Sequence, residues 1–384
     1  MVSDFVMLRR GTVLTAAHIA RIKRLRLEEV LIELPGPGEL QLDISPVELD
    51  ARSLADDEQP TWMSQATFSQ PVPLPELGAA ERLLFARKQE IRTEAGLEPC
   101  IDPEREAELT KGVHATFIAS AVSGEVDLDR LGELADQLSE GLQTSNGRYV
   151  GFTDVEQYGQ VLAARSVLSS KIYSFSGFAN GQYPMQEQLR GHLALANGFA
   201  LMPASLSESG LAGVWKDKEA LSQGLLRYYG WLRQQGFGDD DALEQQLSCL
   251  ERHDGSGLPR GLSGDEIPQL SQNWSLAWHY SGQLLSVPSR PRVSPHQAAV
   301  GLVQQSGRAF SGAAVNGFLR RIGYYPVGSL VELSDDRLGL VVQQNRQALL
   351  KPVVRIVDSD GKVGKVLDLQ QESRVFLSRQ VMEY

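Results

Sequence analysis

The residues best suited to metal or nucleophilic chemistry gather around position 250. Cys249 and His253 stand four residues apart with Glu251 between them, and His279 lies on the next predicted helix. Residues four apart share a helix face, so the thiol and the imidazole could bind one metal ion, although zinc would need a third and a fourth ligand. The same pair could support thiol catalysis, whereas a lone helical cysteine is usually a small buried apolar residue. These interpretations remain alternatives.

Other sequence motifs of catalysis are not found. The chain contains no Gly-x-Ser-x-Gly elbow, no phosphate-binding loop and no Gly-x-Gly-x-x-Gly after a strand pattern. Its two cysteines, Cys100 and Cys249, are far apart and form no CxxC pair. This argues against a disulfide framework and is typical of a reducing compartment. Because these cofactor-binding and metal-binding motifs are absent, we expect no cofactor.

Composition restricts the partners and the compartment. The chain has 384 residues, a formal net charge of −11 and a pI of about 5.2, so broad affinity for nucleic acids or anionic membranes is not expected. A basic run within residues 15–27 is interpreted as a solvated helix face. The first residues do not resemble a signal peptide, and no apolar window reaches about 18 residues. We expect a cytoplasmic protein without nucleic-acid or membrane partners.

The hydrophobic pattern divides the chain into four parts. Residues 1–33 predict a small N-terminal α/β unit, and residues 34–79 predict a Pro-rich linker or arm. Residues 80–323 show helical periodicity almost throughout. Residues 324–384 alternate apolar and polar positions across DD and DG turns, which predicts a C-terminal β-appendage. The expected fold class is mainly α.

A long loop punctuated by glycine and proline lies between two helical patterns, at residues 251–268. Its sequence, ERHDGSGLPRGLSGDEIP, resembles the signature loop of the HD-GYP family, whose members usually have GSGYPRGL after two histidines and a glutamate. SVPSRPRVSP is similar to a family segment that ends in RPxxSP, and YYPVGSLVELSDDRLGLVV resembles the family's closing extension. The resemblance covers about residues 5–33 and 80–360. It implies an HD-GYP-type helical bundle for the mainly α domain.

The resemblance also implies a chemistry that can be tested position by position. Active family members are metal-dependent phosphodiesterases that hydrolyse cyclic di-GMP with two or three metals bound by His and Asp. At the family's ligand positions this chain has Gln160, Asn197, Gly198, Tyr228, Cys249, Leu250 and Trp278. Gln, Asn and Tyr bind such metals poorly, and Gly, Leu and Trp do not bind them. We therefore expect a degenerate domain with no metal and no catalytic residue, that is, a pseudoenzyme.

Cyclic di-GMP binding without hydrolysis is one alternative. Of the two cations that the family places after its last metal ligand, one falls on Val287 and one is kept as Arg290, with Arg260 and Arg292 nearby. Guanidinium groups suit bidentate phosphate contact, although a structural role for Arg290 at the helix–loop junction is the favoured interpretation. A residual phosphodiesterase with a displaced metal site is the second alternative.

Protein recognition is the function that the sequence favours. In the HD-GYP family the signature loop is implicated in contacts with diguanylate cyclase (GGDEF) partners. The candidate interaction loop here comprises Asp254, Gly255, Ser256, Gly257, Leu258, Pro259 and Arg260. Alternatively, its glycines and proline only turn the chain. We expect a regulator or scaffold in bacterial cyclic di-GMP signalling that acts through protein–protein contacts.

Overall fold

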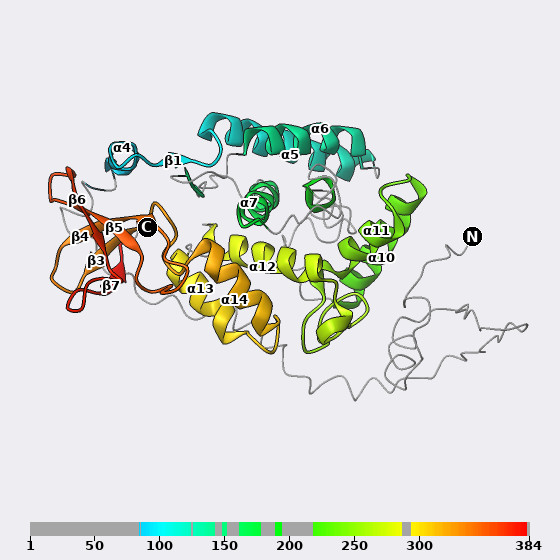
Figure 1. Cartoon of the computed structure of the whole chain (residues 1–384). Helices are drawn as coiled ribbons and strands as arrows, with labels where there is room; N and C mark the ends of the chain where they lie inside the picture. Colours follow the sequence, from blue (N-terminus) through cyan, green and yellow to red (C-terminus); the bar gives the residue numbers. More distant parts are fainter. Residues whose placement is uncertain are drawn as a thin grey trace, which may run out of the picture.

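The computed structural model describes residue 84 and residues 86–123, 126–142, 148–151, 161–177, 189–193, 218–285 and 293–381. The predicted N-terminal unit and linker lie outside these residues, as do Gln160, Asn197, Gly198, Arg290 and Arg292. Figure 1 shows the described part as a body of helices with a sheet at one end. The expected mainly α class with a C-terminal β region is confirmed.

Helices build most of the described chain. They are α4 (Lys88–Glu94), α5 (Pro103–Ser123), α6 (Leu128–Gly141), α7 (Val161–Phe175), α10 (Lys218–Gln234), α11 (Asp240–Leu247), α12 (Gln269–Leu284), α13 (Pro295–Gln304) and α14 (Gly312–Ile322). The short 3-10 helices η3 (Ser248–Leu250) and η4 (Gly264–Glu266) lie just before and within the loop at 251–268.

Side-chain caps fix where several helices begin. The Asp127 carboxylate accepts the N–H of Arg130 at α6, and Ser311 accepts the N–H of Ala314 at α14. At α13, Ser294 and Gln297 form a reciprocal capping box beside a proline at the first position. These signals are local, so the sequence alone specifies these helix starts.

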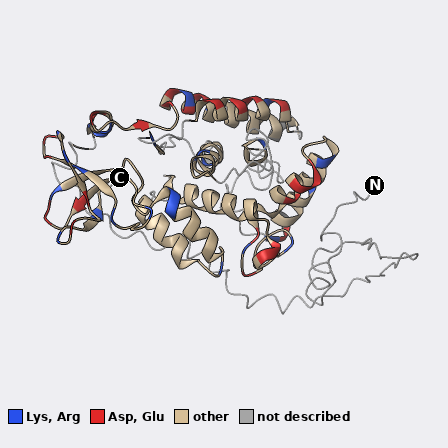
Figure 2. Ribbon diagram, in the orientation of Figure 1, with Lys and Arg blue, Asp and Glu red and all other residues tan. Residues whose placement is uncertain are grey.

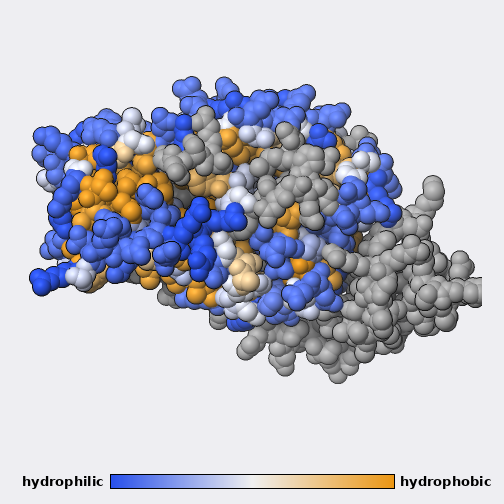
Figure 3. Space-filling model, viewed as in Figure 1, coloured by the Kyte–Doolittle hydropathy of each residue, from blue (hydrophilic) through white to orange (hydrophobic). Residues whose placement is uncertain are grey.

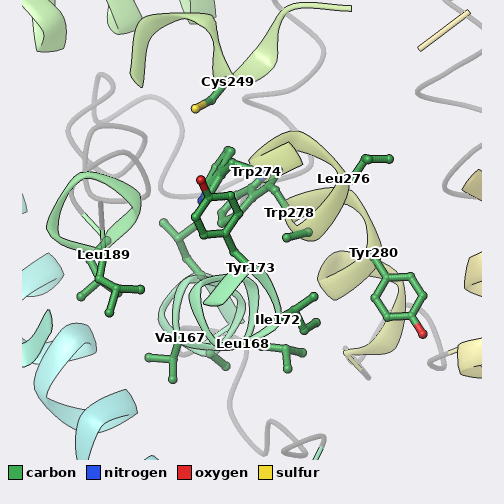
Figure 4. Packing of buried hydrophobic residues seen from close by; sticks show 14 of the residues in the cluster. Val167, Leu168, Ile172, Tyr173, Leu189, Cys249, Trp274, Leu276, Trp278 and Tyr280 are labelled. Carbon is green, nitrogen blue, oxygen red and sulfur yellow. The ribbon is translucent and has the colours of Figure 1, made fainter. Parts of the chain in front are cut away.

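Helices α7 and α12 form the centre of the helical body. They pack against each other, and α7 also packs against α5; Figure 4 shows side chains of α7 and α12 meeting between the two helices. Buried residues lie on all sides of α12, including Trp274, Leu276 and Tyr280. A helix whose residues are buried on all sides lies in the interior of the domain. The loop at 251–268 therefore leads directly into the core.

The C-terminal strands form an antiparallel sheet in the order β6-β5-β4-β3-β7. The strands are β3 (Leu330–Leu333), β4 (Leu338–Gln343), β5 (Val353–Val357), β6 (Val363–Asp368) and β7 (Leu377–Gln380). Alternate residues such as Val331, Leu333 and Val341 are buried, as expected for a sheet with one covered face. Asp336 and Gly361 adopt φ values of 64° and 81° in the DD and DG turns.

Helix α4 joins the helical body to this sheet. Ile91 of α4 belongs to the same buried cluster as Leu340 of β4 and Val357 of β5. Next to α4, the strands β1 (Glu98–Pro99) and β2 (Arg148–Tyr149) form a short parallel pair that the sequence did not predict. Figure 3 shows apolar residues gathered at the end of the molecule that carries the sheet. Among the described helices, none has both the length and the apolar character needed to cross a membrane.

Candidate functional site

The loop at 251–268 follows a path that only glycine allows at several points. Gly255, Gly261 and Gly264 have φ values of 77°, 65° and 52°, a region that residues with a Cβ rarely adopt. Gly257 has no space for a side chain, since an added Cβ would lie 2.2 Å from the backbone nitrogen of Arg252. The glycines that carry the family resemblance are thus required by the conformation of the chain.

Backbone hydrogen bonds attach the start of the loop to the α13–α14 connection. The N–H of His253 donates to the carbonyl of Ala309 at 3.0 Å, and the N–H of Asp254 donates to that of Arg308 at 2.8 Å. An isolated antiparallel bridge then pairs Asp254 with Ser263. The two limbs of the loop therefore lie side by side on a fixed support.

Glu251 is a buried carboxylate at the base of the loop. Its side chain accepts the backbone N–H of Arg260 at 2.7 Å and that of Leu262 at 2.9 Å, and the residue is 3% exposed. Burial raises the pKa of Glu251 to about 7, because the ionised form loses its water, while the hydrogen bonds from the backbone act in the opposite direction. This one side chain holds both ends of the Arg260–Leu262 segment.

Arg260 points into the protein and binds another element. Its Nη1 and Nη2 donate to the two carboxylate oxygens of Glu244 on α11 at 2.8 and 2.6 Å, and Nη2 also donates to Ser248 Oγ at 2.7 Å. Such a bidentate pair has high geometric specificity. The Arg260 side chain is 3% exposed, so in this conformation these donors are used within the protein, not offered to a nucleotide.

The candidate interaction loop is divided by burial. Asp254 is exposed and Gly255 and Ser256 are partly so, whereas residues 257–260 are buried. Asp254 Oδ1 accepts both the N–H and the hydroxyl of Ser256, at 3.0 and 2.6 Å. Burial acts to raise the pKa of Asp254, but the hydrogen bonds from Ser256, together with the nearby guanidinium groups of Arg252 and Arg308, hold this pKa below its usual value. Asp254 is therefore ionised, and its carboxylate lies 3.9 Å from Arg252 Nε.

Two further acidic residues stand on the other limb of the loop. Asp265 and Glu266 of η4 are exposed, and Glu266 accepts the N–H and the hydroxyl of Ser263 at 2.9 and 3.0 Å. Because Asp254 pairs with Ser263, the three carboxylates belong to one end of the loop, and Figure 2 shows the acidic η4 there. We call Asp254, Asp265 and Glu266 the acidic rim. The sequence analysis had not singled out Asp265 and Glu266, although the sequence GDE at residues 264–266 shows two adjacent acidic residues.

Trp278, at a predicted ligand position, lies in an aromatic stack. Its ring is 5.1 Å from that of Trp274 and nearly parallel to it, and Figure 4 shows the two side chains close together. The Arg165 guanidinium lies 4.0 Å from the centre of the Trp278 ring. Arg165 also donates to the Trp278 carbonyl at 2.9 and 3.2 Å. These contacts join α7 to α12 by stacking and cation–π attraction.

The other described ligand positions are also part of the apolar body. Cys249 is 1% exposed and its thiol donates to the Gln245 carbonyl at 3.1 Å; burial raises the pKa of this thiol well above its ordinary value. Tyr228 stacks on Trp231, and burial likewise raises the pKa of Tyr228. Leu250 packs against the same core. These side chains are neutral at physiological pH.

A buried histidine that the sequence analysis had left unassigned lies close by. His192 packs edge-on against Tyr173 at 4.6 Å, and its ring lies tilted by 31° against Trp274 at 5.1 Å. Burial lowers the pKa of His192 well below its ordinary value, so the ring is uncharged. With Gln246 and Cys249 it lines a cavity of about 20 Å³, a volume that suits one water molecule. The sequence around it, LRGHL at residues 189–193, gave no signal beyond a histidine among apolar residues.

The described residues do not fit a metal centre. His279 packs edge-on against Phe310, and its Nε2 lies 3.2 Å from Gln305 Nε2. His253 Nδ1 is buried and has no hydrogen-bond partner among the described residues. Within the described residues, no group of three or more His, Cys, Asp or Glu side chains could hold a metal ion. The displaced site of Cys249, His253 and His279 is therefore not formed in this structure.

Comparison with known proteins gives two matches. Residues 330–384, which include the C-terminal sheet, match the family model described as a KOW domain associated with HD domain. The second match is to a curated protein. The chain is a distant homologue of a cyclic di-GMP phosphodiesterase. That protein, from Pseudomonas aeruginosa, is 28% identical over an alignment of 185 residues, and the match covers 43% of this chain and 44% of the relative. The chain thus matches less than half the length of this relative.

This comparison contradicts one prediction from the sequence. The chain was expected not to be an enzyme, but its relative is a phosphodiesterase. The prediction depended on seven positions, and three of them, Gln160, Asn197 and Gly198, lie outside the described residues. Residue types at assumed family positions were therefore an insufficient basis for excluding catalysis.

Proposed function

We propose that this chain acts in cyclic di-GMP signalling and regulates it through protein contacts at the acidic rim. The similarity to a cyclic di-GMP phosphodiesterase supports the pathway. The observation that supports the contact is the rim itself: Asp254, Asp265 and Glu266 lie on the outer side of a loop whose base is held by Glu251 and Arg260.

A rim on a fixed base is well suited to recognition. The loop is anchored to the α13–α14 connection through backbone hydrogen bonds and to α11 through the Arg260–Glu244 pair. A surface that is ordered before binding loses little conformational freedom in the complex, so more of the contact energy appears as affinity. The rim therefore needs no rearrangement to meet a partner.

The charge of the rim defines the partner's chemistry. Three carboxylates favour a protein that presents Lys or Arg, and such complementarity raises the association rate in a salt-dependent manner. A GGDEF-domain diguanylate cyclase with a basic surface is the partner that the family resemblance suggests. A complex of this kind would make the chain a regulator or scaffold for synthesis of the nucleotide.

Charge reversal at Asp265 tests the contact. We expect Asp265→Lys to weaken binding to a GGDEF-domain cyclase about fivefold, the effect of removing one exposed ion pair and adding a repulsion. Glu108→Lys is the matched control, because Glu108 is exposed on α5, away from the loop. Biolayer interferometry with a panel of purified cyclases measures both. Absence of binding by every cyclase, or equal weakening by the control, would contradict the proposal.

Hydrolysis of cyclic di-GMP is the second candidate function, and the similarity over 185 residues favours it. The purified chain is incubated with cyclic di-GMP and either Mn²⁺ or Fe²⁺, and the linear product is measured by chromatography. Hydrolysis that persists in Asp265→Lys would assign catalysis to a part of the chain other than the rim. Nucleotide binding without product in calorimetry would instead support a receptor.

A further inference from the structure

A second cavity lies where the helical body meets the C-terminal sheet. Its volume is about 120 Å³, several times the space that one water molecule requires. Apolar walls come from both parts of the molecule: Ile91 of α4 and Leu284 of α12 on one side, Val327, Leu330 and Leu340 on the other. Figure 1 shows α4 and β1 at the same end as the sheet. The cavity can therefore take the apolar body of a small molecule.

Positive charge lies on one wall of this cavity. Lys88 and Arg92, one helical turn apart on α4, both line it, and none of the described residues that line it is acidic. The whole chain carries a formal charge of −11. A cavity lined by two cations and no described carboxylate therefore has a local charge opposite in sign to that of the chain. This arrangement favours an anionic group.

The structure holds Arg92 in place. Its Nε and Nη2 donate to the Gly328 carbonyl at 3.1 and 3.0 Å, and its guanidinium lies 4.6 Å from the centre of the Tyr149 ring. Tyr149 in turn lies so close to Gly328 that an added Cβ would be 3.1 Å from the ring. Nη1 of Arg92 makes no hydrogen bond with the described residues. The guanidinium therefore has a fixed position and a donor to spare.

A neutral donor completes the polar wall. Ser329 Oγ accepts a hydrogen bond from Gln380 Nε2 at 3.0 Å, and Gln380 Oε1 is used by the N–H of His296. The Ser329 oxygen thus acts as an acceptor, which leaves its own proton to donate. Ser329 and Gln380 both line the cavity. The polar wall consequently offers hydrogen-bond donors that suit the oxygen atoms of a carboxylate or sulfonate group.

We propose that this cavity binds a small organic anion, with an apolar body against the described apolar walls and an acidic headgroup on Lys88, Arg92 and Ser329. This site is separate from the acidic rim and goes beyond the proposed function. Because its walls belong to both α4 and the sheet, an occupant would contact both. Bound ligand stabilises whatever arrangement it binds, so it would hold the sheet against the helical body.

Octanoate is the probe that tests the site, and 1-octanol is its uncharged counterpart. We expect octanoate to bind saturably with a dissociation constant of about 1 mM, which is typical of a ligand with about ten non-hydrogen atoms. Octanol should bind at least about fivefold more weakly. Isothermal titration calorimetry measures both. Equal affinity for the two probes, or no saturable binding of octanoate at several times that concentration, would overturn the proposal.

Variants locate the binding in the cavity. Lys88→Ala should weaken octanoate binding about fivefold, and it leaves the apolar core in place, since Lys88 is partly exposed and lies outside that core. Val327→Phe should remove binding by filling the cavity while keeping both cations. Lys111→Ala, at an exposed lysine of α5 that does not line the cavity, should leave binding unchanged. Unaltered affinity in Lys88→Ala would place the octanoate elsewhere and refute the site, whether or not Val327→Phe folds.

Discussion

At the scale of single residues, Glu251 has the most unusual chemistry of the loop. A carboxylate buried to this degree is normally costly, yet both of its oxygens accept backbone N–H groups of the Arg260–Leu262 segment. Its pKa is raised to about 7 by burial, so the side chain takes up a proton near neutrality. The geometry of the loop is thus linked to pH through one group.

The sign of this linkage gives a prediction. Since the pKa in the folded state lies above the ordinary value of 4.5, ionisation costs folding energy. The free energy of unfolding should therefore be highest below about pH 4.5 as far as Glu251 is concerned, and should fall by up to about 3 kcal/mol as pH rises through 7. Glu251→Gln should lack this dependence. Urea unfolding of both proteins between pH 5 and 8 measures the difference.

An exposed carboxylate provides the control for this measurement. Glu108→Gln on α5 should follow the wild-type pH dependence, because an exposed carboxylate keeps nearly the same pKa in both states. Parallel curves for wild type and Glu251→Gln would show that the hydrogen bonds from Arg260 and Leu262 offset the cost of burial.

At the scale of elements, the loop at 251–268 is a connector that packs as tightly as a core. It joins η3 to α12, and Gly257 touches the backbone of Glu251 and Arg252. The Arg260–Glu244 pair then fixes the loop to α11. Removing one partner of such a buried pair usually costs several kcal/mol, because the other charge is left without compensation.

Two glycine substitutions separate close packing from ordinary helix propensity. Gly257→Ala should lower the free energy of unfolding by more than about 3 kcal/mol, since its Cβ would overlap backbone atoms that have little freedom to move. Gly317→Ala on α14 should raise it by about 0.5–1 kcal/mol, since Gly317 has no atom within 4 Å of an added Cβ. Urea titration measures both. Equal effects would contradict the packing of the loop.

At the scale of the whole molecule, Arg92 joins the sheet to the helical body. Residues 92 and 328 are far apart in the chain, yet two guanidinium nitrogens of Arg92 bind the Gly328 carbonyl. A second long-range contact, the buried pair of Lys171 and Glu106 at 2.6 Å, fixes α7 against α5. The arrangement of the parts thus depends on a small number of polar contacts in addition to the apolar core.

Arg92→Ala tests the first of these contacts. We expect a loss of about 2 kcal/mol, from hydrogen bonds of a charged donor and the stacking on Tyr149. Arg130→Ala is the control, because the Arg130–Glu133 pair on α6 is exposed and should contribute less than about 1 kcal/mol. Chemical denaturation with urea compares the two. A loss in Arg92→Ala no larger than in Arg130→Ala would show that Arg92 does not hold the sheet.

Much of the local structure followed from the sequence alone. Apolar periodicity predicted the helical region, and alternation with DD and DG turns predicted the C-terminal strands, because both signals act between near neighbours in the chain. That the glycines of the loop at 251–268 turn the chain was one of two interpretations from the sequence, and three of them have positive φ. The family resemblance, first seen in that loop, led to the same pathway as the homologue.

Only the tertiary structure decided which side chains face outward and which meet. Arg260 was a candidate ligand residue in the sequence, but Glu244, sixteen positions away, takes up its guanidinium. The acidic rim needs the pairing of Asp254 with Ser263, and the cavity beside Arg92 needs α4 to pack on the sheet. Burial and partners over long sequence distances depend on how the elements pack, and residue type and spacing do not specify that packing.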